Sequence, residues 1–137
     1  MDVTTIIIRV AISIGIGGLV GLERELEHKP AGLRTIILVC LGSTLFMLIG
    51  YELGLIGSEL GRIVAGVVTG IGFLGAGAII RARGEVYGLT TAATIWLASG
   101  LGIAIGAGYY KLAIVACVSV LIVLRLLGIV ERVINRK

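Results

Sequence analysis

The stretch Gly70–Gly84, GIGFLGAGAIIRARG, places four glycines within eight residues among large apolar side chains and then reaches arginine. A glycine inside a helix in water costs about 1 kcal/mol relative to alanine, so this run is unusual for a soluble helix. The whole chain of 137 residues has the same character, with 58% hydrophobic residues, 15% charged residues and 22 glycines. Soluble domains carry about 25% charged residues. The sequence therefore predicts an integral membrane protein.

Five apolar runs, separated by charged segments, give the predicted architecture. A membrane-spanning helix needs about 20 mainly apolar residues, and these runs lack the alternation of transmembrane barrel strands. We expect an all-α, polytopic membrane protein that forms one domain over residues 1–137, with no soluble C-terminal domain. The predicted transmembrane helices cover residues 5–22, 35–51, 63–80, 88–107 and 111–131.

The lysines and arginines predict the orientation of these helices. Eight of them lie in the first connection, the third connection and the C-terminal tail, whereas three lie at the other helix ends. The positive-inside rule then places the N-terminus outside and the C-terminus in the cytoplasm. Among the three, Arg9 lies near the start of the first helix and is expected to snorkel to the interface. The basic residues border apolar runs, so they indicate topology and not a nucleic-acid partner.

Small residues recur every four positions on several helices and predict close helix packing, because helices in lipid associate through close contact of their backbones. The third predicted helix has small residues on several faces, so we expect it to be the central helix. A large side chain at Gly70 should then disrupt the bundle. The fifth helix is expected to face lipid, and the unused grooves predict a homodimer. The predicted packing glycines are Gly17, Gly21, Gly66, Gly70, Gly72, Gly75, Gly77, Gly102 and Gly106.

A weak internal repeat relates the first two helices to the next two. The segments Gly15–Thr35 and Gly70–Thr91 both run from a glycine-rich helix end through a charged connection to a Gly-Leu-X-Thr sequence. Both copies start on the same side of the membrane, which indicates a parallel repeat with the fifth helix added. A chance match of glycine-rich segments is the alternative.

The candidate site consists of polar residues at the predicted cytoplasmic helix ends. Glu23, Arg24, Arg34 and Arg81 either form a site or anchor the helix ends in lipid headgroups. Hydroxyls near helix starts can cap free N–H groups, and such helix starts attract anions; here they come from Thr35, Thr90 and Thr91. We expect Arg81 to bind Glu23 or a phosphate-bearing ligand, and Arg34 is a second possible partner of Glu23.

The remaining reactive side chains do not indicate catalysis. Cys40 and Cys117 lie inside predicted helices, where buried cysteines usually behave as small hydrophobic residues, and His28 stands alone in a connection. We therefore expect no enzymatic activity, no metal site and no cofactor.

Four segments, GLVGLERE, AGLRT, GIGFLGAGAIIR and GLTTAATIW, resemble the signature segments of the MgtC/SapB membrane proteins, in the expected order between Gly15 and Gly108. The resemblance implies a bacterial inner-membrane protein linked to adaptation to low magnesium and, in pathogens, to virulence. It also implies restraint of the membrane part of ATP synthase as one mode of action. The residues at hallmark positions are Glu23, Arg24, Gly32–Thr35, Arg62, Gly70–Gly77, Arg81, Gly88–Ala93 and Trp96.

The chain also departs from the family pattern. It has Glu59-Leu60 where an acidic-proline pair is common, and Gly66 where the third helix often has a glutamine. Many relatives continue into a soluble domain after the fifth helix, so the chain is either a short member or a truncated form.

Two functions from different classes remain open. The first is a regulator that binds another membrane complex, such as ATP synthase. The second is a small dimeric transporter or channel for an ion or an anionic metabolite, with Glu23, Arg34, Arg62 and Arg81 on its pathway. An anion or lipid-headgroup site at the cytoplasmic helix ends is compatible with both.

Overall fold

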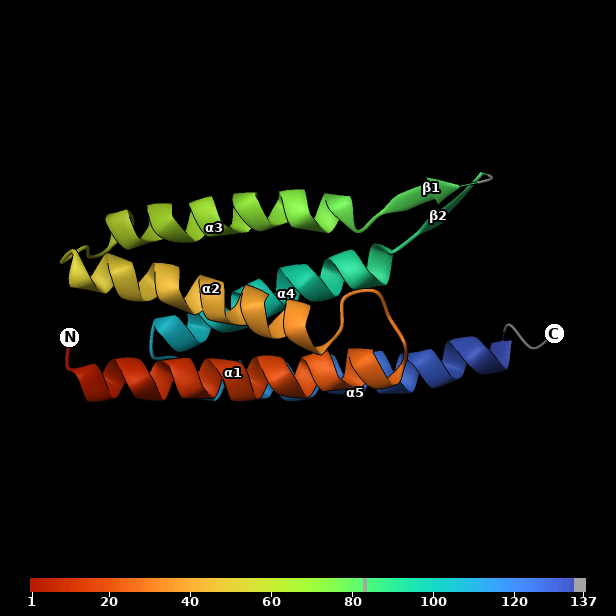
Figure 1. The fold of residues 1–137 in the computed structure, drawn as a ribbon, viewed down its shortest axis with the longest axis horizontal. Coiled ribbons are helices and arrows are strands. Elements are labelled where there is room, and N and C mark those ends of the chain that lie inside the picture. The colour runs from red at the N-terminus through yellow and green to blue at the C-terminus, as the bar shows by residue number, and fades with distance from the viewer. Residues whose placement is uncertain (83, 135–137) are drawn as a thin grey trace.

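The computed structural model describes residues 1–82 and 84–134, and it forms an elongated bundle of antiparallel helices (Figure 1). Five helices in this part of the chain are long and apolar enough to cross a membrane, which confirms the predicted fold class. Arg83, Arg136 and Lys137, three of the eight basic residues predicted to be cytoplasmic, lie outside the described residues. The elements are α1 (Val3–Leu26), α2 (Leu33–Glu52), α3 (Ser58–Gly77), β1 (Ile80–Ala82), β2 (Glu85–Tyr87), α4 (Leu89–Gly106) and α5 (Tyr110–Ile134).

Two helix boundaries differ from the prediction in ways that affect the site. α1 continues to Leu26, so Glu23 and Arg24 lie on the helix itself and not in a connection. α3 ends at Gly77, and the following residues form an antiparallel hairpin in which Arg81 pairs with Val86. The hairpin moves Arg81 away from the end of the third helix, where the sequence had placed it.

The helix ends gather at two ends of the bundle. The α1–α2 connection, the β1–β2 hairpin and the last residues of α5 lie at one end, which we call the hairpin end (Figure 1). The α2–α3 and α4–α5 connections lie at the opposite end. This arrangement brings Arg24, Lys29, Arg34 and Arg81 to the hairpin end, as the sequence predicted from the alternation of the spans.

The glycines that precede α2 and α4 differ in backbone conformation, which is extended at Gly32 and left-handed at Gly88. Each helix begins at a leucine directly after a glycine, Gly32 or Gly88. Gly88 has a positive φ of 87°, a conformation that glycine adopts without steric cost. The Glu25 carboxylate accepts a hydrogen bond of 3.0 Å from the Leu33 N–H and thereby caps α2.

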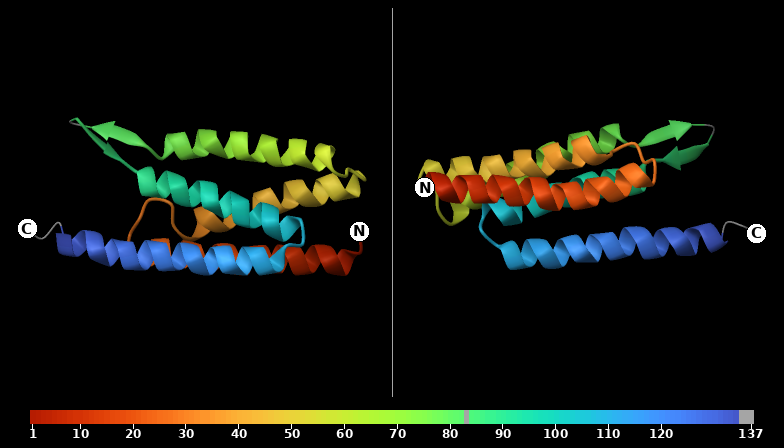
Figure 2. Two further views of the ribbon diagram at one scale, coloured as in Figure 1. Left: turned by 180° about the vertical axis from the view of Figure 1, so that it is seen from behind. Right: turned by 60° about the horizontal axis from the view of Figure 1, so that its bottom comes forward.

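The packed centre of the bundle consists of α2 and α4, and not of α3. We compared the share of buried residues in an apolar 18-residue stretch of each helix. This share is 44% for α2 and 50% for α4, but only 6% for α3. Figures 1 and 2 show α3 at one edge of the bundle and α5 at the opposite edge. The prediction of a central third helix is therefore wrong for the single chain, because glycine content does not tell which faces meet another backbone.

Four of the predicted packing glycines lie where two backbones come close. A Cβ atom at Gly21 would lie 2.9 Å from Leu33 Cα, and one at Gly106 would lie 2.6 Å from Met47 Cβ. Gly17 meets α2 in the same way, and a Cβ at Gly102 would collide with the carbonyl oxygen of Cys40. These glycines allow α2 to pack closely against both α1 and α4.

The predicted packing glycines on α3 are differently placed. Gly75 makes ordinary van der Waals contact with Ala92 of α4. Gly66, Gly70, Gly72 and Gly77 have open space where a Cβ would lie. A leucine at Gly70 is therefore not expected to disrupt the packing of a single chain, contrary to the prediction from sequence.

Buried hydroxyl groups join α1, α2 and α4, which we call the inner helices, midway along the bundle. Thr44 Oγ1 lies 3.1 Å from Ser13 Oγ on α1 and 2.9 Å from the Gly102 carbonyl oxygen on α4. Ser43 Oγ lies 3.1 Å from Ser99 Oγ. Hydroxyls satisfied in this way hold neighbouring helices together in lipid, where water does not compete for them.

Arg9 holds the opposite end of the bundle together. Its Nη1 donates to the Gly106 carbonyl oxygen at 2.5 Å, at the end of α4, and its Nε lies 3.3 Å from the Tyr110 hydroxyl. Its guanidinium also lies over the Tyr51 ring, 5.6 Å from the ring centre. Arg9 therefore binds protein groups of three helices, whereas the sequence suggested only an interfacial anchor.

Replacing Gly102 by alanine should destabilise the bundle, because the added methyl group collides with the α2 backbone. We expect a loss of about 1–3 kcal/mol, typical of overpacking, measured as a lower melting temperature in detergent. Gly100→Ala on the same helix is the matched control, since a Cβ there meets open space and alanine favours the helix. Equal melting temperatures for the two variants would contradict the close approach of α2 and α4.

Candidate functional site

The end of α1 carries two buried charged residues. Glu23 is 6% exposed and Arg24 is 3% exposed, although both lie within two turns of the hairpin end. Glu27 lies one turn beyond Glu23, and residues four apart share one face of a helix. Because charged side chains are rarely buried without partners, this cluster is the strongest candidate for a functional site.

The start of α4 supplies a partner for Arg24. Arg24 Nη2 donates a hydrogen bond of 2.8 Å to Thr91 Oγ1, and Thr91 is itself buried. The left-handed conformation of Gly88 turns the chain from β2 into α4 and so places Thr91 in the first turn of that helix, facing α1. The end of the first helix and the start of the fourth are thereby joined by one charge-assisted hydrogen bond.

The hydrogen-bonding capacity of the two charged residues is only partly used. Glu23 Oε2 and Arg24 Nε are buried and have no hydrogen-bond partner among the side chains that the structure describes, those of residues 1–81, 84–130 and 133–134. Buried polar atoms almost always have a partner, because leaving one without costs several kcal/mol in an apolar environment. The site therefore has one acceptor and one donor whose hydrogen bonds the described side chains leave unsatisfied.

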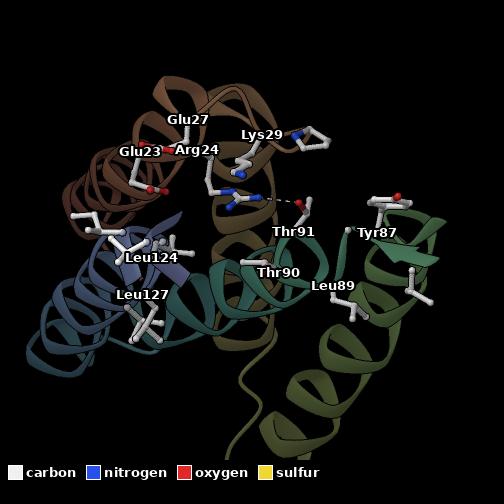
Figure 3. Close-up of a pocket in the computed structure, with 17 residues that line it drawn as sticks. Glu23, Arg24, Glu27, Lys29, Tyr87, Leu89, Thr90, Thr91, Leu124 and Leu127 are labelled. Atoms are coloured by element: carbon white, nitrogen blue, oxygen red, sulfur yellow. Dashed lines mark hydrogen bonds between the residues drawn. The ribbon is translucent and has the colours of Figure 1, made fainter. Parts of the chain in front are cut away.

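These residues line a cleft of about 1160 Å³, which we call the hairpin-end cleft (Figure 3). Its polar side comes from the end of α1, the α1–α2 connection and the start of α4. Its apolar side comes from α5, where Leu124 and Leu127 face the cleft. Figure 3 shows the Arg24 guanidinium between these two sides, directed at Thr91. The polar lining residues are Glu23, Arg24, Glu27, Lys29, Tyr87, Thr90 and Thr91.

The structure brings together half of the predicted site residues. Glu23, Arg24, Thr90 and Thr91 line the cleft. Thr35 lies on a smaller hollow of about 360 Å³ between α2 and α3, which Thr91 also borders. Thr35 therefore lies at the same end of the bundle as the cleft but does not line it.

The predicted arginines other than Arg24 do not line the cleft. Arg34 and Arg81 are exposed, and Arg62 is exposed near the start of α3 at the opposite end. Within the described ranges, no ion pair joins Glu23 to Arg34 or Arg81. The expected pairing of Glu23 with either arginine is therefore wrong for this structure, because Arg81 lies on the hairpin and neither exposed arginine lines the cleft.

Three contributions to the site were missed in the sequence. Glu27 and Lys29 line the cleft beside Glu23 and Arg24. The signal for Glu27 was its spacing of four residues from Glu23, which becomes informative once α1 extends to Leu26. The apolar wall from α5 had no local signal, since every face of that helix is rich in leucine, isoleucine and valine.

Comparison with known proteins gives a consistent match. The profile of the MgtC family matches residues 10–133. The chain is 42% identical to the Escherichia coli K12 protein named "Putative magnesium transporter YhiD", over 86% of this chain and 58% of the relative. It is 39% identical to Protein SapB of Bacillus subtilis, over 93% of this chain and 58% of the relative. No solved structure gives a significant match.

A third relative shows how much of these proteins the chain represents. Protein MgtC of Salmonella typhimurium LT2 is 43% identical over 77% of this chain, but the match covers 45% of the relative. The chain thus spans about half the length of the curated relatives it matches. The family profile covers residues 10–133, which include every residue that lines the hairpin-end cleft.

Replacing Thr91 by valine should weaken the contact between α1 and α4. Valine keeps the shape of threonine but leaves Arg24 Nη2 without its partner. We expect a loss of about 1–2 kcal/mol, measured as a lower melting temperature in detergent. Thr90→Val is the matched control, because Thr90 is exposed and should change stability by less than about 0.5 kcal/mol. If both variants melt together, the Arg24–Thr91 bond does not stabilise the fold.

Proposed function

We propose that this chain, which belongs to the MgtC family, is a regulator that supports growth at low magnesium by controlling another membrane complex. The hairpin-end cleft is its control site. The observation that carries the proposal is the buried pair Glu23 and Arg24, each with a polar atom that lacks a partner, at the cleft between α1 and α4. Such a site suits a molecule whose binding changes how these two helices meet.

The link to magnesium rests on the relatives. The chain is a multi-pass bacterial membrane protein, and the name of the E. coli relative refers to magnesium. Because the match covers only part of each relative, activity and partners belong to the proposal. The membrane part of ATP synthase is the first candidate for the controlled complex, as the resemblance in the sequence suggested.

The packing of the inner helices favours regulation over transport. The interface between α1, α2 and α4 is filled by buried side chains, including Ile36, Cys40 and Ile105. A solute crossing there would require these helices to separate. The cleft, in contrast, is open to binding without any such movement.

A transporter is the second candidate function, and one observation favours it. Polar groups follow the interface of α1, α2 and α4 along its length, from Arg24 and Thr91 through the Ser13–Thr44 hydroxyls to Arg9 at the opposite end. Polar residues inside a membrane bundle often mark a pathway for ions. A transporter of this kind would carry its solute between α1, α2 and α4, and it would be detected as solute flux across liposomes that contain only this chain.

The orientation follows from the charge distribution. We propose that the hairpin end is cytoplasmic, because it holds the larger share of the lysines and arginines. The N-terminus then lies outside, and the cleft faces the cytoplasm of a bacterium with its polar side at the inner-membrane surface.

Growth of a host that lacks its own homologue, in medium low in magnesium, tests the control site. Arg24→Lys should lose most of the rescue, since lysine cannot provide the planar fork of donors, whereas Arg81→Lys should rescue like the unmodified chain. Membrane levels of both variants are compared on the same blots. Liposomes that contain only this chain should show no saturable flux of Mg²⁺ or phosphate.

Two results would contradict the proposal. Equal rescue by Arg24→Lys and the unmodified chain would remove the cleft as control site. Saturable flux that Arg24→Lys abolishes would establish the transporter instead.

We also propose that the chain forms a homodimer through the outer face of α3. This face holds Gly66 and Gly70 with open space around them, and Phe73 is 84% exposed. A photo-crosslinking residue at position 70 should give a dimer in native membranes, and the same residue at Val118, on the exposed part of α5, should give none. Only monomer from position 70, or equal dimer from both positions, would contradict the proposal.

A further inference from the structure

The hairpin-end cleft forms where α5 separates from the inner helices. α5 packs against them through Ala113, Cys117 and Val120, which are buried. Beyond Val120, one side of α5 lines the cleft, including Val123, Leu124 and Leu127, and Leu127 is 54% exposed. The apolar wall therefore continues from the membrane-spanning part of α5 to the polar residues at the end of α1. A cleft with this shape and polarity fits an amphiphile and not a fully water-soluble molecule.

The polar side of the cleft holds charges of both signs. Two carboxylates, of Glu23 and Glu27, and two cations, of Arg24 and Lys29, line it. A purely anionic ligand would meet the carboxylates, and a purely cationic ligand would meet the arginine and lysine. A ligand with one negative and one positive group can place each beside the opposite charge, where charge-assisted hydrogen bonds are strong.

The available polar atoms define where these groups would bind. Arg24 already donates through Nη2 to Thr91, and its buried Nε has no hydrogen-bond partner among the described side chains. Guanidinium donors match the oxygens of a phosphate group. Glu23 Oε2 is a buried acceptor without a partner, which suits an ammonium group that carries N–H donors.

We propose that the hairpin-end cleft binds a zwitterionic phospholipid with a primary ammonium, of the phosphatidylethanolamine class. Its phosphate binds Arg24, its ammonium donates to Glu23, and one acyl chain lies along Leu124 and Leu127. The proposal identifies a ligand for the control site and rests on the proposed function only for the regulatory meaning of that binding. Binding itself is measured on the purified chain, without reference to growth.

The test uses the whole chain in dodecyl maltoside and measures its melting temperature with added short-chain lipids. Dioctanoyl-phosphatidylethanolamine should raise the melting temperature saturably. The phosphatidylcholine analogue should act at concentrations at least about tenfold higher, because its trimethylammonium group has no N–H for Glu23. The phosphatidylglycerol analogue and water-soluble glycerophosphoethanolamine should have little effect.

Two substitutions locate the binding site. Glu23→Gln should remove the preference for ethanolamine over choline, with the preference falling from about tenfold to less than twofold. Leu127→Ser should weaken the lipid effect several-fold. Leu126→Ser is its matched control, since Leu126 is 58% exposed on the same helix but does not line the cleft. If Glu23→Gln fails to fold, the lipid preference of the unmodified chain and the comparison of Leu127→Ser with Leu126→Ser still test the lipid site.

Several results would overturn the inference. Equal stabilisation by all three lipids would indicate a detergent-like effect, and stabilisation by glycerophosphoethanolamine equal to that by the lipid would indicate a soluble ligand. A preference for phosphatidylglycerol would indicate an anion site. If Glu23→Gln loses the ethanolamine preference yet supports growth at low magnesium, the lipid site stands and the proposed control function fails. If the unmodified chain shows no lipid preference and Glu23→Gln abolishes growth at low magnesium, the proposed control function stands and the lipid site fails.

Discussion

The close approach of α2 to both α1 and α4 is the constraint on which the rest of the structure depends. Lipid gives helices no hydrophobic reason to associate, so contact must come from backbones that approach closely and from polar groups that satisfy one another. Gly21 and Gly106 lie where α2 meets its two neighbours. That spacing also brings Thr44 within reach of α1 and α4. With α1 and α4 held on one helix, Arg24 can reach Thr91.

The same constraint explains why the hairpin end is left incomplete. α4 begins only at Leu89, after the hairpin, and Leu124 is the last residue of α5 that packs against the core. At the end of α1, Arg24 therefore contacts the start of α4, and α5 lies on the other side of the cleft. The hydroxyls in the middle of the bundle have partners on neighbouring helices, whereas at this end one buried atom of Glu23 and one of Arg24 have no partner among the described side chains. The cleft thus results from where α4 begins and from where α5 stops packing against the core.

The sequence was sufficient for the fold class and for part of the site, for physical reasons. Long apolar runs predict spans in lipid whatever their neighbours are, and a charged pair such as Glu23 and Arg24 at a run's end is visible without a structure. The role of α3 was not predictable in the same way, because a glycine such as Gly70 has the same signal whether it faces a backbone or open space. The position of Arg81 depended on a hairpin of three-residue strands, too short to show a pattern.

The abundance of the inferred ligand limits how the cleft can regulate. A ligand that binds only the folded state stabilises it according to its concentration relative to its dissociation constant. A bilayer lipid is always present at high local concentration, so its binding alone would be constant and would complete the contact between α1 and α4 permanently. Regulation then requires a competitor for the same groups. A partner that presents a charged residue to Arg24 or Glu23 would displace the headgroup, and the helix contact at Thr91 would respond to the partner and not to the lipid.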